Sequence, residues 1–484
     1  MKNIISILLC MLFALSVFAQ KTPTKTLSKD EKKVLKELDS NFETYSDIAH
    51  NIWEFAELGY KEEKSSNLLS TTLEEEGFKI ETGVADIPTA FVATYGSGKP
   101  VIAILAEFDA LPGVSQDAVP YRKEITKGGT GHACGHHLFG AGSTAAAIAV
   151  KNWLKANKKT GTIKLMGTPA EEGGAGKVYM VRAGLFDDVD VTLHWHPSSS
   201  NSASAASSLS NKSAKFRFYG QAAHASAAPE RGRSALDGVE AMNYMTNLLR
   251  EHVPMETRIH YVITSGGEAP NVVPEFAEVF YYVRHPDMKH VKTIFERVVK
   301  AAEGAAMGTG TKMEYEVIHG LYNVLPNETI AKKMHVNLSL IGGVEYTDEE
   351  KVFAEKIMAT YSEINPQITD AVTIKPYTVS YKGTGGSTDV GDVSWAVPTA
   401  GLRTATWVPG TSAHTWQAVA AGGTSIGHKG MIAAAKTLAL TAIDIYNEPQ
   451  LTEEAKAELL KMRGKDFKYE ALLGDRKPPL DYRD

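Results

Sequence analysis

The chain is poor in cysteine and carries no excess of positive charge. Only 2 of its 484 residues are Cys, which excludes a small fold held together by a disulfide framework. Its 51 Lys and Arg residues are outnumbered by 57 Asp and Glu residues, and the formal net charge is -6. A nucleic-acid-binding protein normally carries a basic surplus, so that function class is disfavoured. With 43% hydrophobic residues, the chain has enough apolar side chains for a folded core.

Long apolar runs are scarce as well, and the one that stands out lies at the start. Residues 1–19 combine Lys2, a short apolar run and a small-residue end at Ala19, which is typical of a secretory signal peptide. A membrane anchor is the alternative, but the run is short for a span. We expect cleavage near Ala19 and Gln20, a secreted or periplasmic location, and no membrane attachment after signal removal.

Removal of this signal would leave a single thiol. Cys10 belongs to the signal, so Cys134 would be the only cysteine of the mature chain. A lone Cys is often a small apolar core residue. Cys134 stands instead among three histidines, in Gly-His-Ala-Cys-Gly-His-His at residues 131–137. This neighbourhood favours a reactive or metal-binding thiolate.

Hydrophobic periodicity predicts an α/β fold. Short apolar runs predict buried strands at 101–106, 162–167, 190–196 and 399–406. Helical patterns fall before, between and beyond them, at 28–80, 141–154, 178–183, 327–340 and 429–446, and within 28–80 a second helix is predicted from about 65 to 76, where Gly77 ends it. Strands that alternate with helices indicate a layered α/β domain.

A different order of elements interrupts this alternation. Residues 198–213 are rich in Ser, Ala and Asn and predict a crossing between domains. The next segments predict strand, helix, strand, strand, helix and strand at 214–220, 233–251, 257–265, 276–284, 287–307 and 312–318. This βαββαβ order is ferredoxin-like, and we interpret it as a domain inserted into the α/β domain. The tail from Glu453 predicts a surface helix and an extended end.

Polar clusters follow the predicted strands, at the edge where open α/β sheets build their sites. Cys134 and His136 are two residues apart in a Gly-containing loop, so a thiolate and an imidazole can bind one metal. Glu171 and Glu172 are adjacent, and adjacent side chains on extended backbone point in opposite directions. One of these carboxylates can therefore bind a metal while the other acts on water.

Two histidine segments add donors, His194-Trp-His196 at a strand end and His414 in a loop. The candidate donors are then Cys134, His136, Glu172, His196 and His414. Such a set with a bridging water suits a pair of metals about 3.5–4 Å apart. The H-E-x-x-H motif of one-metal proteases and the G-x-S-x-G motif of nucleophile-elbow hydrolases are absent. The Gly-Lys segments 96–99 and 173–177 lack the spacing of a phosphate loop.

Eight stretches of the chain match one enzyme family. They are AEFDALPG (106–113), GHACGHHLFGAGS (131–143), GTPAEEGGAGK (167–177), WHP (195–197), GQAAHASAAPERGRSALD (220–237), NVVP (271–274), GGSTDVGDVSW (385–395) and SAHTWQ (412–417). On these stretches the chain resembles the amidohydrolase branch of the dinuclear-metal aminoacylase and carboxypeptidase superfamily. It is most similar to aminobenzoyl-glutamate hydrolases of the B-subunit type.

The resemblance implies a role for each matching residue. Those with an implied role as metal ligands are Cys134, His136, Glu172, His196 and His414, with the Cys134 thiolate between the metals. Glu171 matches the catalytic base, and His224 matches a residue that stabilises the reacting carbonyl in the neighbouring subunit. Asn271 and Arg284 match positions that hold substrate.

Two positions depart from the family pattern. Glu107-Phe-Asp109 stands where many members have His-x-Asp, so His136 is expected to replace the missing ligand and Asp109 to orient it. His137 stands where related amidohydrolases have Asp. The surroundings of the metals, and with them the metal preference, are therefore expected to differ from those of relatives.

The resemblance also implies a three-layer α/β catalytic domain with an inserted ferredoxin-like lid and dimerisation domain. The expected segments are a signal peptide (1–19), the catalytic domain in two parts (28–212 and 321–448), the inserted domain (213–320) and a tail (449–484).

The activity so implied is hydrolysis of a small amide by a homodimer with two divalent ions per subunit, Zn or Mn. The substrate would be an N-acyl or aroyl amino acid, similar to aminobenzoyl-glutamate, or a dipeptide. A metal-dependent binding protein that has lost catalysis is the alternative, although the retained Glu171 disfavours it. A structural exported protein ranks below both.

Replacing the thiol tests its role as a metal ligand. We expect Cys134→Ala to lose bound metal and amide-hydrolysing activity together, because the proposed thiolate lies between both metals. Damage to the fold should be modest, since Ala fills most of the same small space. Elemental analysis, activity and a denaturation curve measure the three effects. A variant that keeps its full metal content would contradict the assignment.

Overall fold

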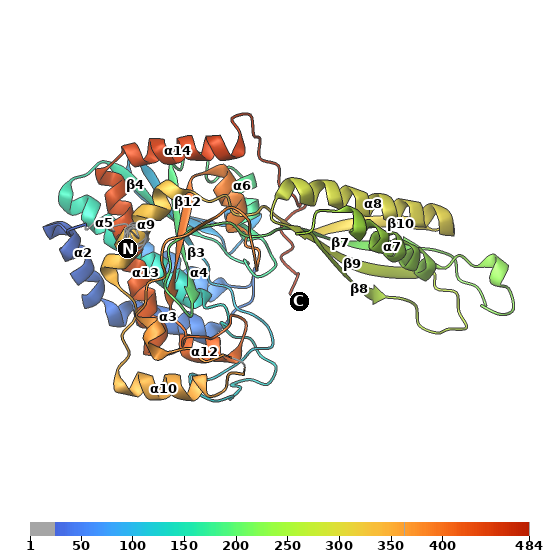
Figure 1. The fold of residues 1–484 in the computed structure, drawn as a ribbon, viewed down its shortest axis with the longest axis horizontal. Helices are drawn as coiled ribbons and strands as arrows, with labels where there is room; N and C mark the ends of the chain where they lie inside the picture. Colours follow the sequence, from blue (N-terminus) through green and yellow to red (C-terminus); the bar gives the residue numbers. More distant parts are fainter. Residues whose placement is uncertain (1–24, 363, 484) are drawn as a thin grey trace, which may run out of the picture.

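The computed structural model describes residues 25–362 and 364–483 and has an elongated shape (Figure 1). A rounded α/β unit holds both ends of the described chain, and a narrow second unit projects from one side. The predicted signal peptide and Cys10 lie outside the described residues, so export stays a prediction. None of the described helices combines the length and hydropathy needed to cross a bilayer.

The α/β unit is built on a six-stranded sheet in the order β1-β2-β4-β3-β5-β12. Its strands are β1 (Lys79–Thr82), β2 (Phe91–Ser97), β3 (Val101–Ala106), β4 (Gly161–Gly167), β5 (Val191–Ser198) and β12 (Thr399–Ala405). The four strands β4, β3, β5 and β12 are parallel, while β1 and β2 add an antiparallel edge. Every residue of β3 is buried, which explains its unbroken apolar sequence.

Helices pack around this sheet. They are α2 (Lys29–Ser40), α3 (Phe42–Phe55), α4 (Glu63–Glu75), α5 (His136–Asn157), α6 (Gly176–Arg182), α9 (Glu328–Ile341), α10 (Asp348–Met358), α11 (Val390–Ala396), α12 (Trp416–Gly422), α13 (Ser425–Asn447) and α14 (Gln450–Arg463). The Ala-rich helices α5 and α13 pack against each other and against the central strands. The predicted α/β fold class is confirmed.

Two local predictions differ from the structure. The helical pattern over 28–80 is divided by Asn41 and by Ala56, which takes the left-handed conformation at φ 42° and ends α3. The second helix predicted within it, at about 65–76, is confirmed as α4. The strands β1 and β2 were not predicted. The edge strand β1 is mostly exposed, and β2, which lies between β1 and β4, is buried only over its first three residues, so neither has the long apolar run that marks a fully buried strand.

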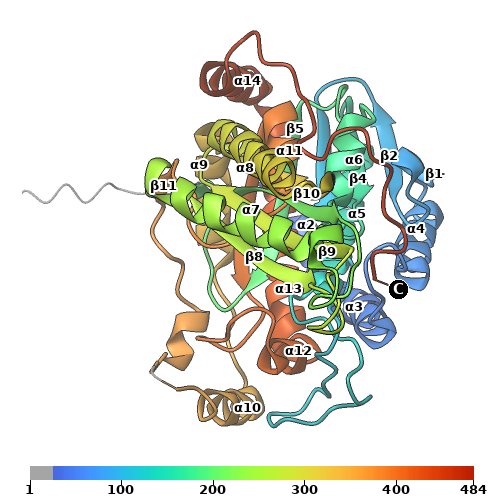
Figure 2. The same ribbon diagram turned by 90° about the vertical axis from the view of Figure 1, so that its right-hand side faces the viewer.

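The projecting unit has the ferredoxin-like order expected from the sequence. Its strands are β7 (Ser210–Tyr219), β8 (Arg258–Ser265), β9 (Phe276–His285) and β10 (Lys312–Leu321), in the antiparallel order β10-β7-β9-β8. Helices α7 (Ala235–Leu249) and α8 (Met288–Thr309) pack together over this sheet (Figure 2). Strand β7 begins at Ser210 rather than 214, because its first residues already pair with β9.

The two units meet at one end of the small sheet. Asn211 pairs with Leu321 and with Arg284, so the chain enters and leaves the projecting unit at neighbouring positions. Strand β7 then runs ten residues outward, a distance of about 30 Å at the usual rise of a strand. His224 lies in the loop beyond that far end, where it bridges to Val272. The loop of His224 is therefore remote from the α/β unit of its own chain.

Candidate metal centre

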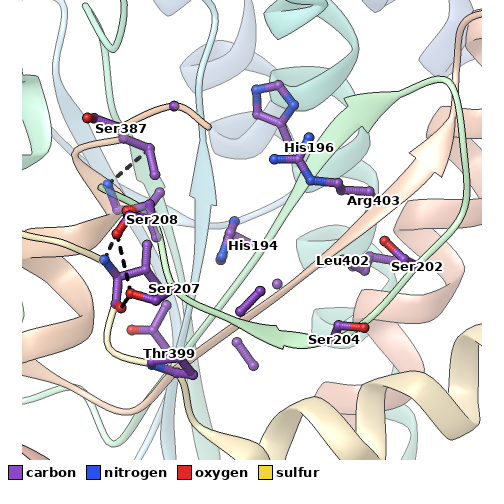
Figure 3. Close-up of a pocket in the computed structure, with 18 of the residues that line it drawn as sticks. His194, His196, Ser202, Ser204, Ser207, Ser208, Ser387, Thr399, Leu402 and Arg403 are labelled. Carbon is purple, nitrogen blue, oxygen red and sulfur yellow. Dashed lines mark hydrogen bonds between the residues drawn. The ribbon is translucent and has the colours of Figure 1, made fainter. Parts of the chain in front are cut away.

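A cavity of about 520 Å³ opens at the carboxyl ends of the parallel strands (Figure 3). Glu107 follows β3, Glu171 and Glu172 follow β4, His196 ends β5, and His414 lies in the loop after β12. Crossing connections bring such strand ends to one edge of the sheet, which is where α/β folds bind their ligands. Side chains far apart in the sequence therefore line one space.

The expected metal ligands lie together in two overlapping groups. Candidate ligand atoms of Cys134, His136 and His196 lie within 4.8 Å of one another, and so do those of Cys134, Glu172 and His414. Cys134 Sγ is 3.5 Å from His196 Nε2, and Glu172 Oε1 is 3.0 Å from His414 Nε2. The thiol therefore belongs to both groups. His194 lines the cavity but joins neither group.

A turn places the first pair of donors. Gly135 has φ 76°, the left-handed conformation that favours glycine, and it separates Cys134 from the first residue of α5, His136. His196 is fixed by its own Nδ1, which donates to the Pro197 carbonyl at 2.7 Å. Its Nε2 is then left to face Cys134.

Buried polar atoms in and beside these groups have close charged neighbours but no well-formed hydrogen bond. Among the described residues, His136 Nε2 is 3.1 Å from Glu107 Oε2, and Glu172 Oε1 is 3.0 Å from His414 Nε2. A cation bound between these nitrogen and oxygen atoms would give them the partner that burial requires. Burial also raises the pKa of the Cys134 thiol to about 12, and a divalent cation is the usual means of favouring a thiolate in such a place. The residues present therefore fit a metal centre.

Asp109 holds two of these residues at once. Its Oδ1 is 2.8 Å from His136 Nδ1, and its Oδ2 accepts the backbone N–H of Glu172 at 2.9 Å. Burial raises the pKa of Asp109, but the charge and hydrogen bond of His136 outweigh it and lower the pKa below its ordinary value. An ionised Asp109 favours a proton on His136 Nδ1. The other ring nitrogen, Nε2, lies 3.1 Å from Glu107 Oε2, and a metal could take the place of this contact.

A buried ion-pair cluster lies beside the expected ligands and was not predicted. Lys177 Nζ is 2.7 Å from Glu107 Oε1 and 2.7 Å from Asp389 Oδ1. The Lys177 backbone N–H also donates to Asp389 Oδ2 at 2.9 Å. The sequence held two signals, a lone Lys in the otherwise apolar start of α6 and an Asp inside GGSTDVGDVSW. Neither revealed that the two segments meet.

Glu171 lies among other carboxylates. Its oxygens and those of Glu107 and Asp389 come within 4.8 Å of one another. Burial, followed by the charges of Glu107, Glu172 and Asp389, raises the pKa of Glu171 well above its ordinary value. A carboxylate of this kind accepts a proton readily and can return it, which is what a general base that later acts as an acid requires.

Hydrogen bonds to residues distant in the sequence hold the loop that carries Glu171 and Glu172. Ala170 has φ 57°, and its N–H donates to the fully buried Glu62 at 2.8 Å. The Glu172 carbonyl accepts from Tyr482 Oη at 3.1 Å and from Arg483 Nη2 at 2.7 Å. The tail beyond α14 was expected to be merely extended, but it crosses the molecule and ends against this loop.

Three expected residues of the projecting unit stay outside the cavity. His224 is exposed, and its Nδ1 accepts the N–H groups of Ser226 and Ala227 at 3.3 and 3.2 Å. Asn271 is exposed at the same far end. Arg284 lies at the near end of β9, with its guanidinium 5.2 Å from the centre of the Tyr282 ring. Within one chain these residues do not meet the metal ligands.

His137, which departs from the family pattern, also faces away from the ligands. Its Nε2 donates to the Gly422 carbonyl at 3.1 Å, and the ring is fully buried against that of His132. Burial and the neighbouring imidazole of His132 lower the pKa of His137 well below its ordinary value. The residue is therefore a neutral packing group between α5 and α12.

Comparison with known proteins yields one consistent family. Residues 103–418 match the family model described as peptidase family M20/M25/M40. The chain is 42% identical over 446 residues to the B-subunit of the p-aminobenzoyl-glutamate hydrolase from Escherichia coli (strain K12), covering 87% of this chain and 93% of the relative. It is 29% identical to the Xaa-Arg dipeptidase of Mus musculus, with 88% and 91% covered.

Solved structures share the fold. A dinuclear metal-binding peptidase of the M20 family from Bacillus subtilis has a TM-score of 0.55 at 19% identity and covers 86% of this chain and 99% of its own. This likeness supports the same two-part architecture, with a smaller unit projecting from the α/β unit.

Removing the buried lysine tests the ion-pair cluster. Lys177→Met keeps the length of the side chain but leaves Glu107 and Asp389 buried without a cation, and we expect a loss of about 3–5 kcal/mol in the free energy of unfolding. Urea denaturation measures it. Lys79→Met is the matched control, because Lys79 pairs with Glu81 on an exposed edge strand and should matter little. Equal stability of the two variants would contradict the buried-cluster argument.

Proposed function

Since the chain belongs to peptidase family M20/M25/M40, we propose that it releases an amino acid from a small N-acyl or aroyl amino acid or from a dipeptide. It is an amidohydrolase, as its motifs implied, and it carries groups of metal-binding residues. The observation that best supports the proposal is the position of Glu171, whose carboxylate lies within 4.8 Å of His136 and Glu172, one from each of the two candidate ligand groups that share Cys134.

We assign two divalent ions, Zn or Mn, to the ligand set. It consists of Cys134, His136, Glu172, His196 and His414. Thiolate and imidazole favour Zn, while the carboxylate also suits Mn. When bound, such a pair would lower the pKa of a water and polarise the amide carbonyl.

The residues of the chain then account for the movement of the proton. Glu171 takes a proton from the attacking water, whose oxygen forms a bond to the carbonyl carbon. The C–N bond breaks, and Glu171 returns the proton to the leaving amine. A raised pKa makes the ionised Glu171 a stronger acceptor for the proton of the water, and the protonated group can then donate to the amine. Asp109 keeps His136 and Glu172 in place throughout.

The relatives support the class of substrate. One is described as part of a p-aminobenzoyl-glutamate hydrolase and another as an Xaa-Arg dipeptidase, and both names denote an amide with a free amino-acid end. The cavity of about 520 Å³ suits a molecule of that size.

A substrate panel with one inactive variant tests this function. We expect the metal-loaded protein to release an amine from p-aminobenzoyl-glutamate, from other N-acyl amino acids or from dipeptides. Glu171→Gln should lower kcat at least about 100-fold, because a general base contributes that much or more. Its metal content, measured by elemental analysis, should be unchanged. Turnover at the wild-type rate would exclude Glu171 as the base. No turnover of any substrate by the metal-loaded wild type would favour the binding protein.

We also infer a homodimer that shares its active sites. His224 lies beyond the outer end of β7, about 30 Å from where that strand leaves the α/β unit. In this position it cannot serve the cavity of its own chain, but the same unit of a second copy could reach it. The Escherichia coli relative is named as one subunit of its enzyme. In the alternative arrangement, a different chain would therefore supply the histidine that reaches the cavity.

Mixing two inactive variants tests the shared site. Glu171→Gln and His224→Ala should each be inactive alone, because every site of either dimer lacks one group. Refolded or expressed together, they should recover about a quarter of wild-type activity, since about half the dimers are mixed and each has one complete site. Absence of recovery, with mixed dimers shown by mass spectrometry, would contradict the arrangement.

A further inference from the structure

One positive charge faces the cavity without a partner. Among the described residues that line it, Arg403 alone is a Lys or Arg. Its backbone pairs with Ser202, but its guanidinium has no hydrogen bond or ion pair within the described part of the chain. Other arginines are engaged, as Arg217 is with Glu278 and Arg476 with Glu316. The free guanidinium of Arg403 therefore needs an explanation.

The strand register aims this side chain at the metal ligands. Strands β5 and β12 are parallel neighbours in which Arg403 pairs with His196 and Gly401 with His194. Side chains of paired residues project from the same face of a sheet. Figure 3 shows Arg403 extending toward the ring of His196. Gly401 is required beside it, because a Cβ there would overlap the His194 ring.

The electrostatics of the cavity leave room for an anion at this side. Of its acids, Glu107 is paired with Lys177 and Glu172 with His414, while Glu171 lies beside Glu107 and Asp389. Surrounding protein lowers the pKa of the Arg403 guanidinium, and Cys134 is the one group that opposes this shift. The Arg403 side chain is nevertheless exposed to the cavity, so an anion that enters the cavity can reach the guanidinium. No protein carboxylate is in place to do so among the described residues.

The cavity wall is rich in hydroxyl groups. Ser202 and Ser204 lie on the side of Arg403, while Ser207, Ser208 and Ser387 lie across the cavity from it (Figure 3). Ser387 Oγ is buried and has no hydrogen-bond partner. A polar wall with a free donor favours a hydrophilic ligand group over an apolar one.

We infer that Arg403 binds a carboxylate of the substrate, the one on the carbon next to the scissile amide nitrogen. This inference rests on the proposed amide hydrolysis and defines its substrates as amides of amino acids whose α-carboxylate is free. The nearness of Arg403 to His196 places the anion within a few bonds of the amide to be cut. The planar guanidinium suits such a group, since it can donate two parallel hydrogen bonds to the two oxygens.

Two other roles for Arg403 predict different results. A guanidinium that stabilised the oxyanion of the reacting carbonyl would serve every amide alike, with or without a carboxylate. A guanidinium that only balanced the Cys134 thiolate would affect metal content rather than ligand choice. Selectivity for the carboxylate therefore separates the proposal from both.

Binding to an inactive protein tests the inference without turnover. In metal-loaded Glu171→Gln, calorimetry would compare p-aminobenzoyl-glutamate with its α-carboxamide, which lacks the negative charge. We expect Arg403→Met to weaken binding of the acid about 10- to 100-fold, the usual effect of losing hydrogen bonds to a charged group. Binding of the carboxamide should change little. Arg297→Met, which removes an exposed arginine of α8, is the matched control and should alter neither.

Kinetics and a second variant complete the test. In the protein with Glu171 intact, Arg403→Met should lower kcat/KM for the acid and erase the preference for acid over carboxamide. Arg403→Lys keeps the charge but not the paired hydrogen bonds, so it should retain part of that preference. Equal losses for acid and carboxamide, unchanged binding of the acid, or loss of metal from both Arg403 variants would each overturn the assignment. Carboxylate-selective binding without any hydrolysis would support Arg403 and refute the proposed function instead.

Discussion

The carboxylate of Asp109 connects two parts of the site that arrive on different elements. One of its oxygens bonds the imidazole of His136 at the start of α5, and the other accepts the N–H of Glu172 after β4. Both oxygens are buried, so neither ligand can shift without leaving a polar atom unpaired. Asp109 itself follows β3, the most deeply buried strand. Through these two hydrogen bonds, the rigid centre of the sheet holds the proposed metal ligands His136 and Glu172 in place.

Negative and positive side chains lie on different sides of the cavity, and this separation would orient a charged substrate. Carboxylates gather around Glu171, where the single cation Lys177 is paired with both Glu107 and Asp389. The free guanidinium of Arg403 lies on β12, at the other side. A substrate with one carboxylate would therefore enter in a single orientation, with its anion toward Arg403 and its amide toward Glu171. Orientation by fixed charges of this kind requires no movement of the chain.

The candidate ligands could be selected from the sequence because each lies in a short motif at the end of a strand. Cys134 and His136 are two residues apart, and Glu171 and Glu172 are adjacent, so local spacing is informative. Lys177 with Asp389, and Glu172 with Tyr482, are separated by hundreds of residues. Such pairs arise only from tertiary packing, which no local pattern contains. Arg403 was missed for the same reason, since its meaning depends on register with His196 and on the lack of an acid beside it among the described residues.

The projecting unit enters and leaves the α/β unit through paired residues. Asn211 pairs with Leu321 across two antiparallel strands, so the insertion begins and ends at neighbouring positions, like the two ends of a β-hairpin. Once the insertion has folded, closing the chain around it costs no more conformational entropy than closing a short loop. The two halves of the catalytic sheet can then associate as if they were nearly contiguous. We therefore expect the insertion to form early in folding, so that it guides β12 to its place beside β5.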